Sequence, residues 1–409
     1  MAGHGGNAGS QIVTLAVRRV LSIATLYPNA HTPRFGTFVA RQMEALAARG
    51  DWEVTLINPI GVPPIAFGPY RALARAVESG QENGVDVHRI RFPLIPRIGA
   101  RLNPSAIRRA ILPLARRLHA ERPFDLVDAQ FFFPDGPAAA TIAKALDLPL
   151  SIKARGADIH YWGSLPWARR AIIDAGKQAA GMLAVSQALA ADMAALGLPQ
   201  NTITVHYTGL DRARFRPLGR AESRQRLAGM YGLPSDPTHR LLASVGALIP
   251  RKGQSLVIKA LARIDGADLG LVGAGPDETR LRRLATELGV ADRVHFLGNI
   301  DHDLLPIVLS AADAMVLPSS SEGLANAWIE ALACGTPLVI CDAGGAREVV
   351  RDASAGFVVK RDAPEIAQAI GALLKAPPRP EVVAANADRF SWQANAQALA
   401  DYYERLLTA

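Results

Sequence analysis

The 409-residue chain has little cysteine and no long apolar run. Its two cysteines, Cys334 and Cys341, exclude a disulfide framework, and their spacing does not match that of a zinc knuckle. No run approaches the roughly 18 apolar residues that a membrane-spanning helix needs. The N-terminal residues lack the charged and then apolar pattern of a signal peptide, so residues 1–19 are expected to form a flexible tail. These absences favour a protein of the cytoplasm.

Familiar nucleotide and metal motifs are also absent. The chain has neither the G-x-G-x-x-G pattern of dinucleotide-binding domains nor the G-x-x-x-x-G-K-[ST] phosphate loop. The nine histidines show no metal-ligand spacing, so no metal is expected. The triplet 301–303 (Asp-His-Asp) has the form of a metal-binding D-x-D motif, but it precedes a helical pattern and is interpreted as a helix cap.

Charge is unevenly distributed along the chain. Residues 1–205 contain 22 Lys and Arg against 14 Asp and Glu, whereas residues 206–409 contain 23 of each, so the first half carries the whole net charge of +8. A basic half favours contact with an anionic partner, such as phosphates or a membrane surface. A nucleic-acid partner is not expected, because no recognition motif accompanies the high isoelectric point of about 9.8.

Short apolar runs alternate with helical patterns through both halves of the chain. With 49% hydrophobic and 20% charged residues, the composition is globular, and the length predicts more than one domain. Continuous apolar runs are typical of parallel strands that are buried on both faces. The pattern therefore predicts an α/β protein with two doubly wound, Rossmann-like domains. The expected strands lie at 20–25, 52–60, 85–92, 124–130, 149–156, 182–186, 202–207, 241–248, 267–275, 293–299, 314–320, 337–345 and 356–360.

Polar and proline-rich stretches mark the domain boundaries. We expect a first domain at 20–209, a linker at 210–220, a second domain at 221–389 and a C-terminal helix at 390–409. The helix has one apolar face, which either packs on its own domain or crosses back to the first. Ligands of open α/β sheets bind beyond the carboxyl ends of the strands, so the cleft between the domains is the expected site.

The segment 319–340 carries the strongest candidate site. It follows an expected strand and opens a helix that ends near Gly335. Glu322 and Glu330 are eight residues apart, about 12 Å along a helix, so one carboxylate can reach a sugar while the other meets a ribose diol. Taken singly, Glu322 can instead be a helix cap and Glu330 a solvated residue. The helix N-terminus would offer anion-binding N–H groups at Gly323, Leu324, Ala325 and Asn326.

A basic loop at 245–256 is the second candidate. It follows an expected strand, begins with Gly246, and places Arg251 and Lys252 before a helix, where they can neutralise a diphosphate. In isolation the same residues describe a solvated basic turn. The glycine-rich turn at 273–276 is a weak signal by itself.

Together these segments resemble the retaining GT-B glycosyltransferases of glycosyltransferase family 4. The stretches that carry the resemblance are EGLANAWIE (322–330), EALACGTPLV (330–339), Lys252-Gly253, GAGP (273–276) and FLG (296–298) in the second half, with GTFVARQMEAL (36–46), FFFPDGPAAA (131–140) and KARGADI (153–159) in the first. The first half is most similar to members that build bacterial exopolysaccharide or teichuronic-acid-type polymers. The resemblance covers nearly the whole chain from about residue 20.

The resemblance implies a set of site residues and partners. Glu322, Lys252 and Arg251 are implied to be catalytic, and no metal or other cofactor is expected. Arg155, Asp158 and Asp135 are implied on the side of the acceptor or donor sugar. The implied partners are a nucleotide-sugar donor and a glycan or polyprenyl-diphosphate-linked acceptor. The implied donor-binding residues are Glu330, Gly246, Gly323, Leu324, Ala325, Asn326, Asn299, Ile300 and Gly36.

Some positions depart from the family pattern. Ala247 and Leu248 stand where an arginine is frequent, so Arg251 can substitute or Lys252 can act mainly alone. Arg155-Gly156 replaces a frequent His-Gly pair, residues 208–211 read Thr-Gly-Leu-Asp in place of Asn-Gly-Val-Asp, and Ala325 replaces a second glycine. None of these changes removes the glutamate pair.

The segment 103–123 is an expected arginine-rich helix. Asn103 is the expected N-cap, and Pro113 is expected to kink or split the helix. Its arginines at 108, 109, 116 and 117 form either a solvated face or a docking surface for an anionic membrane, which would make the protein peripheral on the inner face of that membrane.

The leading functional hypothesis is sugar transfer with retention of configuration, in cell-surface polysaccharide synthesis. The alternatives are a nucleotide-sugar epimerase of the same fold and a non-catalytic nucleotide-sugar-binding protein. The presence of Glu322, Glu330 and Lys252 disfavours the non-catalytic alternative.

Overall fold

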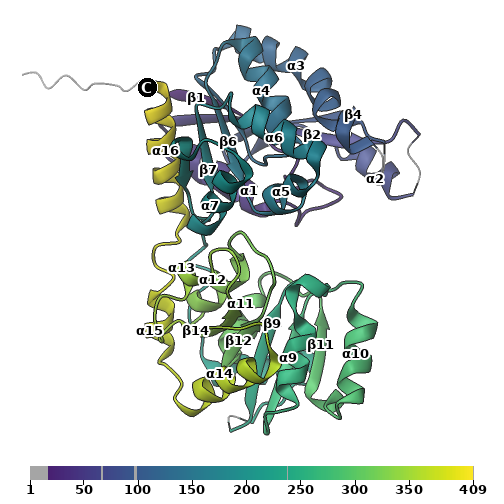
Figure 1. The fold of residues 1–409 in the computed structure, drawn as a ribbon, viewed down its shortest axis with the longest axis vertical. Helices are drawn as coiled ribbons and strands as arrows, with labels where there is room; N and C mark the ends of the chain where they lie inside the picture. Colours follow the sequence, from purple (N-terminus) through teal and green to yellow (C-terminus); the bar gives the residue numbers. More distant parts are fainter. Residues whose placement is uncertain (1–16, 66–67, 96–98, 237, 409) are drawn as a thin grey trace, which may run out of the picture.

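Two stacked α/β domains make up the structure, a computed structural model that describes residues 17–65, 68–95, 99–236 and 238–408 (Figure 1). The expected tail lies outside the described residues except at its end, where Arg18 and Arg19 already belong to the first strand. The sheet of the first domain has the order β3-β4-β2-β1-β5-β6-β7-β8. Its strands are β1 (Arg18–Ile23), β2 (Trp52–Val62), β3 (Gly80–Glu82), β4 (Val85–Pro93), β5 (Leu126–Ala129), β6 (Leu150–Ala154), β7 (Gly181–Ala184) and β8 (Ile203–Val205).

The second domain contains an all-parallel sheet in the order β11-β10-β9-β12-β13-β14. Its strands are β9 (Arg240–Val245), β10 (Ala267–Val272), β11 (Val294–Gly298), β12 (Ala314–Leu317), β13 (Leu338–Cys341) and β14 (Gly356–Val359). The predicted fold class is confirmed, and each apolar run expected to be a strand overlaps one. The sequence missed β3, which pairs antiparallel with β4, because its three residues include no apolar side chain.

Helices cover both faces of each sheet (Figure 1). In the first domain they are α1 (Thr37–Ala47), α2 (Pro69–Arg75), α3 (Asn103–Glu121), α4 (Asp135–Leu146), α5 (Ala157–His160), α6 (Pro166–Gly176) and α7 (Gln187–Leu196). In the second domain they are α8 (Arg220–Tyr231), α9 (Gln254–Leu261), α10 (Glu278–Glu287), α11 (Leu305–Ala311), α12 (Asn326–Ala333), α13 (Ala346–Val349), α14 (Ala363–Lys375) and α15 (Pro380–Ala385).

Helix α3 differs from its prediction at its start. Its N-cap is Leu102 rather than Asn103, and the helix continues through Pro113 without being split. Pro113 is exposed, so water can satisfy the carbonyl group that loses its N–H partner at this turn.

The C-terminal helix α16 (Trp392–Thr408) crosses back and packs on the first domain (Figure 1). Its buried residues Leu399 and Tyr403 join the core formed by α1 and the central strands of the first sheet, and the Tyr403 ring lies 5.2 Å from that of Trp52. The crossing segment runs beside the linker, since Leu210 and Ser391 form a β-bridge. The predicted linker at 210–220 connects β8 to α8, and α8 itself begins at Arg220.

A buried polar cluster joins α16 to the first sheet. The Lys153 ammonium, which is fully buried, donates to Gln42 Oε1 at 2.7 Å and lies 2.6 Å from His206 Nδ1. The other ring nitrogen of His206 lies 2.9 Å from the backbone carbonyl of Asn395 in α16. Burial lowers the pKa of Lys153 well below its ordinary value.

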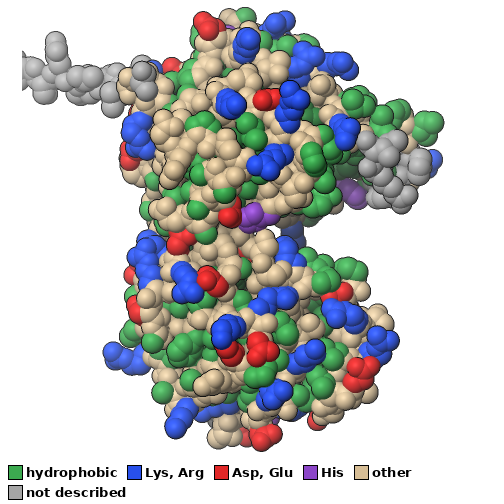
Figure 2. Space-filling model, viewed as in Figure 1, with side chains coloured by type: hydrophobic (Ala, Val, Ile, Leu, Met, Phe, Trp, Pro, Cys, Tyr) green, Lys and Arg blue, Asp and Glu red, His purple; other side chains and the backbone are tan. Residues whose placement is uncertain are grey.

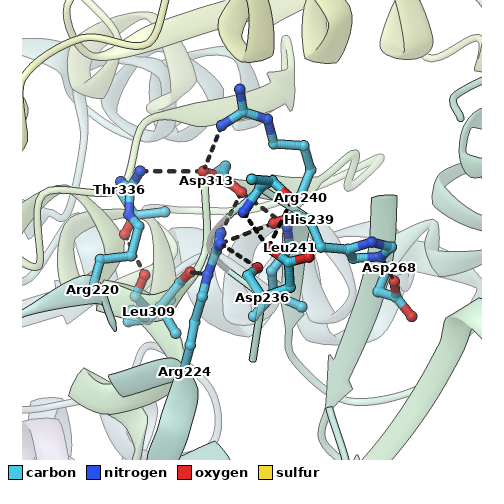
Figure 3. Close-up of polar contacts among 12 residues, drawn as sticks. Arg220, Arg224, Asp236, His239, Arg240, Leu241, Asp268, Leu309, Asp313 and Thr336 are labelled. Atoms are coloured by element: carbon cyan, nitrogen blue, oxygen red, sulfur yellow. Dashed lines mark hydrogen bonds and ion pairs between the residues drawn. The ribbon is translucent and has the colours of Figure 1, made fainter. Parts of the chain in front are cut away.

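Figure 3 shows the polar contacts that hold α8 against the second sheet. Asp313, which precedes β12, has a side chain that is 2% exposed and accepts from Arg224 at 2.7 Å and from Arg220 at 3.2 Å. It also accepts the backbone N–H of Leu241 in β9 at 2.8 Å. The charge of the buried Asp313 carboxylate is balanced by two arginines, and a backbone N–H group donates a further hydrogen bond to it. These contacts fix the N-terminal end of α8 directly after the linker.

Candidate active site

The loop after β12 brings Glu322 to two cations. Glu322 is 8% exposed, and its Oε1 lies 2.5 Å from the Lys252 ammonium while its Oε2 lies 3.3 Å from the Arg251 guanidinium. Arg251 also donates to the Ser321 carbonyl at 2.5 Å. The three residues with implied catalytic roles are thus in direct contact, although 70 positions separate Lys252 from Glu322. A diphosphate entering here would compete with the Glu322 carboxylate for both cations.

Helix α12 begins four residues after Glu322. It starts at Asn326 and is followed by Gly335, which has the positive φ of 78° that a helix-terminating glycine supplies. No acidic residue lies in its first turn, and no side chain caps it. Its free N–H groups therefore remain available to an anion.

A cavity of about 550 Å³ lies between the two domains. The first domain contributes residues from the N-terminal turns of α1, and the second contributes the ends of β9, β10 and β11 together with α12. Figure 2 shows the molecule hollowed on one side between the two domains. The predicted residues that line the cavity are Gly246, Asn299, Ile300, Asn326 and Glu330.

The remaining predicted donor-side residues lie around the cavity rather than in its wall. The loop at 323–325 lies at the domain boundary, where Leu324 packs against the cores of both domains and Ala325 belongs to the core of the second. Gly36 is the N-cap of α1 with φ of 73°, and a Cβ there would come within 2.4 Å of the Leu26 backbone. A glycine is therefore required at position 36 to hold the start of α1 against the loop after β1.

Glu330 faces the cavity from the second turn of α12 and meets a histidine. Its Oε1 lies 3.5 Å from His302 Nε2, and its side chain is 13% exposed. The other ring nitrogen of His302 lies 2.9 Å from an Arg214 nitrogen, and Arg214 also pairs with Asp303 at 2.9 Å. The linker thus orients the histidine that contacts Glu330. Within the triplet, Asp301 accepts the backbone N–H of Asp303 at 3.1 Å, whereas α11 begins later, at Leu305.

We expect Glu330→Gln to weaken the binding of a nucleoside diphosphate by about 10- to 100-fold, because a charge-assisted hydrogen bond contributes about 1.5–3 kcal/mol. The rate of turnover at saturating donor should change much less, since a ribose contact is the same before and during the reaction. Calorimetric titration and steady-state kinetics measure the two quantities. Glu287→Gln, which removes an exposed carboxylate on α10, is the matched control. A variant that binds the nucleotide as well as the control would contradict the ribose role.

The three residues implied on the sugar side behave differently from one another. Arg155 stacks over the Phe38 ring at 4.7 Å, and burial lowers its pKa to about 10, so it stays charged at neutral pH. Asp158 and Asp135 are fully buried, and desolvation raises both pKa values, that of Asp135 to about 7. Asp158 accepts the backbone N–H groups of 132, 155 and 156, and Asp135 accepts that of Thr25. These aspartates hold loops in place and do not line the cavity.

Contacts between the domains fix the loop that carries Glu322. A Cβ on Gly323 would come within 2.6 Å of the Arg155 carbonyl, so the backbones of the two domains touch at this point. Ser321 Oγ lies 3.1 Å from His160 Nδ1 of the first domain. Glu348 of α13 accepts the backbone N–H of Gln187 at 2.9 Å and so caps α7 across the boundary.

Several cavity residues carried no signal in the sequence. Arg34 reaches across the cleft and donates to the Ile300 carbonyl at 2.9 Å. Arg214 belongs to no recognised motif, and His302 is only the variable middle position of the 301–303 triplet. Trp392 enters the cavity only because the chain crosses back between the domains. These residues come together only through tertiary contacts, so no local sequence pattern predicts them.

Two family models match the chain. The model "Glycosyltransferase Family 4" matches residues 35–214, and "Glycosyl transferases group 1" matches residues 232–390. The two matches together span most of the chain, and they coincide with the two domains on either side of the cavity. The chain belongs to the family 4 type of glycosyltransferases, and its two facing Rossmann-like domains have the GT-B fold.

Curated relatives are similar over about half of the chain. A "GDP-mannose-dependent alpha-(1-6)-phosphatidylinositol monomannoside mannosyltransferase" of Mycolicibacterium smegmatis is 35% identical over 53% of this chain and 59% of its own length. A "D-inositol 3-phosphate glycosyltransferase" of Mycobacterium tuberculosis (strain F11) is 37% identical over 50% of this chain and 44% of its own length. The matched part therefore spans only about half of these relatives.

Solved structures share the fold over nearly the whole chain. A sucrose-phosphate synthase from Thermosynechococcus elongatus has a TM-score of 0.73 at 22% identity, over 96% of this chain and 99% of its own. Anabaena HepE in complex with UDP has a TM-score of 0.71 at 20% identity, over 95% and 100%. These likenesses establish the architecture.

Proposed function

We propose that the protein is a hexosyltransferase that moves a sugar from a nucleotide-sugar donor to a glycan or lipid-linked acceptor with retention of configuration. The observation that carries the proposal is the contact of Glu322 with Lys252 and Arg251 beside a cavity that Glu330 lines. The expected setting is cell-surface polysaccharide synthesis on the inner side of the membrane.

Each residue has a distinct part in this proposal. Lys252 and Arg251 hold the diphosphate and stabilise the negative charge that grows on it as the bond to the sugar breaks. Glu322 faces the sugar, where positive character develops at the anomeric carbon. Glu330 and the free N–H groups of α12 bind the ribose and phosphate portions of the donor. The two domains touch at Gly323, and this contact is proposed to limit the access of water to Glu322.

The nucleotide and the sugar are the first things to test. Relatives named as GDP-mannose-dependent make GDP-mannose the first candidate, and a UDP-bound neighbour of the same fold makes UDP-sugars the second. Thermal shift with a panel of UDP-, GDP- and ADP-sugars, combined with nucleotide release in the presence of glycan acceptors, tests the proposal. Release of nucleotide with formation of a new glycoside supports it. Conversion of the donor sugar without any acceptor would instead identify an epimerase, and donor binding without turnover would identify a binding protein.

Catalysis is proposed to need no metal ion. Among the described residues there is no group of three or more His, Cys, Asp or Glu side chains placed to hold one. Lys252, Arg251 and the α12 terminus would supply the positive charge that a divalent cation supplies elsewhere. We expect EDTA to change kcat by less than about twofold, measured by nucleotide release with and without added Mn²⁺. Complete loss of turnover in EDTA that Mn²⁺ restores would overturn this proposal.

The first domain is proposed to dock on an anionic membrane. In the part of the chain that the structure describes, no helix is long and apolar enough to cross a bilayer. On α3, Arg109 and Arg116 are exposed, and each basic residue near an anionic surface contributes about 1 kcal/mol. Figure 2 shows Lys and Arg side chains gathered over the outer part of the upper domain, where Figure 1 places α3.

We expect the protein to float with vesicles that contain anionic lipid, to float much less with neutral vesicles, and to lose binding as salt is raised. Arg109→Gln/Arg116→Gln should reduce the bound fraction about 10-fold or more, because two such contributions are removed. An exchange of the same size on α10, Arg282→Gln/Arg283→Gln, is the control. Equal flotation with neutral and anionic vesicles, or none with either, would leave α3 as a solvated surface.

A further inference from the structure

A second cavity, which the proposed chemistry does not use, lies among the helices of the first domain. Its volume is about 330 Å³, and it is bounded by α3, α4 and α6. The lining residues of α3 and α6 come from the first two turns of these helices and include Ser105 and Trp167, and α4 contributes Pro137 from its first turn and Thr141 from its middle. Helices that follow parallel strands begin at the carboxyl edge of the sheet, so this cavity opens on the same edge as the central cleft. We call it the α3–α6 pocket.

Two arginines line the α3–α6 pocket. Arg101 comes from the short turn η1 (Gly99–Leu102) and lies 5.3 Å from the Trp167 ring centre, while Arg108 comes from the second turn of α3. Within the described part of the chain, neither has a carboxylate within the 4.0 Å of an ion pair. The first turn of α3, which also borders the pocket, contains no acidic residue. The pocket therefore has positive charge and hydroxyl groups but no anion to balance them.

A row of aromatic rings leads from the α3–α6 pocket to the loop that carries Glu322. The Trp167 and Phe133 rings are 5.4 Å apart, Phe133 and Trp162 are 4.9 Å apart, and Trp162 and Tyr161 are 5.1 Å apart. Tyr161 is 61% exposed. The next residue in the chain is His160, whose contact with Ser321 lies directly beside Glu322. The exposed rings of this row provide an apolar surface of the kind on which sugar rings pack.

We propose that the α3–α6 pocket binds a phosphate group at one end of the acceptor, a proposal that rests on the proposed glycosyltransferase function. Arginine matches phosphate because its planar fork donates two hydrogen bonds to one anion. The sugar rings of the acceptor then lie over Trp162 and Tyr161, and the far end enters the cleft at Glu322. The acceptor class is thus a phosphate-bearing oligosaccharide, whether the phosphate is free or belongs to a lipid headgroup.

Titration with inorganic phosphate tests the pocket directly. The full chain is first saturated with the nucleoside diphosphate that gives the largest thermal shift, so that the diphosphate site in the cleft is occupied. Tryptophan fluorescence then follows phosphate binding, because Trp167 lines the pocket. Arg101→Gln/Arg108→Gln is compared with Arg101→Lys/Arg108→Lys and with Arg109→Gln/Arg116→Gln, which removes the same charge from α3 outside the pocket.

We expect the glutamine pair at 101 and 108 to raise the Kd for phosphate at least 10-fold, the lysine pair to raise it less, and the 109/116 pair to stay within twofold of the unaltered protein. The proposal would be overturned if the unaltered protein bound no phosphate. It would also be overturned if Arg101→Gln/Arg108→Gln had an unchanged melting temperature and an unchanged Kd for phosphate. If Arg101→Gln/Arg108→Gln has a lowered melting temperature, the test relies on Arg101→Lys/Arg108→Lys instead. A Kd for phosphate in that variant within twofold of the Kd of Arg109→Gln/Arg116→Gln would overturn the proposal.

Vesicles of phosphatidylcholine with one third phosphatidylinositol distinguish the two sources of phosphate. Binding that inorganic phosphate competes away, and that the 101/108 glutamine pair lacks, identifies a headgroup. This comparison is made in the Arg109→Gln/Arg116→Gln background, which removes the membrane contact proposed for α3. A bound fraction there no larger than with phosphatidylcholine alone, together with a positive phosphate titration, identifies a soluble phosphorylated glycan. Failure of the glycosyltransferase proposal itself would be visible separately, as a chain that binds no nucleoside diphosphate in the first step.

Discussion

Replacement of Glu322 with glutamine is expected to lower kcat by about 10²- to 10³-fold while changing donor affinity by less than about threefold. The carboxylate is 8% exposed and lies between Lys252 and Arg251, so glutamine keeps its shape but removes its charge. In the proposed mechanism, that charge stabilises the positive character that develops on the sugar as the diphosphate departs. An interaction that strengthens only in the transition state raises kcat without tightening the bound donor.

Measurements of kcat and donor Kd on Glu322→Gln and Glu330→Gln in parallel separate the two glutamates. Glu287→Gln controls for the loss of an acidic side chain in the same domain. Normal turnover in Glu322→Gln together with weak donor binding would show that the roles assigned to Glu322 and Glu330 are wrong.

Lys252→Ala is expected to weaken donor binding about 10-fold and to lower kcat about 100-fold, because the diphosphate is present in the ground state and gains charge as it leaves. The same change leaves the buried Glu322 carboxylate with only Arg251, whose side chain is 44% exposed. A simple loss of activity would therefore not distinguish phosphate binding from support of Glu322.

A double-mutant cycle makes that distinction. If Lys252 acts on the diphosphate, Lys252→Ala/Glu322→Gln should bind donor more weakly than Glu322→Gln alone. If Lys252 only holds Glu322, the double variant should bind donor as Glu322→Gln does, which would contradict the phosphate role. Lys259→Ala, at an exposed position on α9, is the matched control, and circular dichroism verifies that each variant folds.

Much of the architecture could be predicted because its signals are local. Continuous apolar runs mark strands buried on both faces, and such runs occur from β1 to β14 with β3 as the exception. Local propensity did not decide between a kink and a split at Pro113, because the cost of a missing N–H bond depends on whether that turn faces water.

The candidate site was predictable where its residues share one short segment. Glu322 and Glu330 stand eight positions apart around the start of one helix, so sequence spacing alone relates them. Asp135 and Asp158 carried the same kind of family signal, yet both lie fully buried on backbone N–H groups. Sequence spacing does not reveal burial, and burial decides whether a carboxylate meets substrate or supports a loop.

By itself, the sequence determined the two-domain α/β class, the family resemblance and the glutamate pair, because periodicity and motif spacing are properties of contiguous residues. Only the tertiary structure decided that α16 packs on the first domain, since its apolar face had two candidate partners and the core around Trp52 and α1 is the one it completes. Only the tertiary structure brought Lys252 to Glu322 and Arg34 to Ile300. The first contact joins residues 70 positions apart within the second domain and forms once that domain has folded. The second joins residues 266 positions apart and forms only when the two domains have closed on one another.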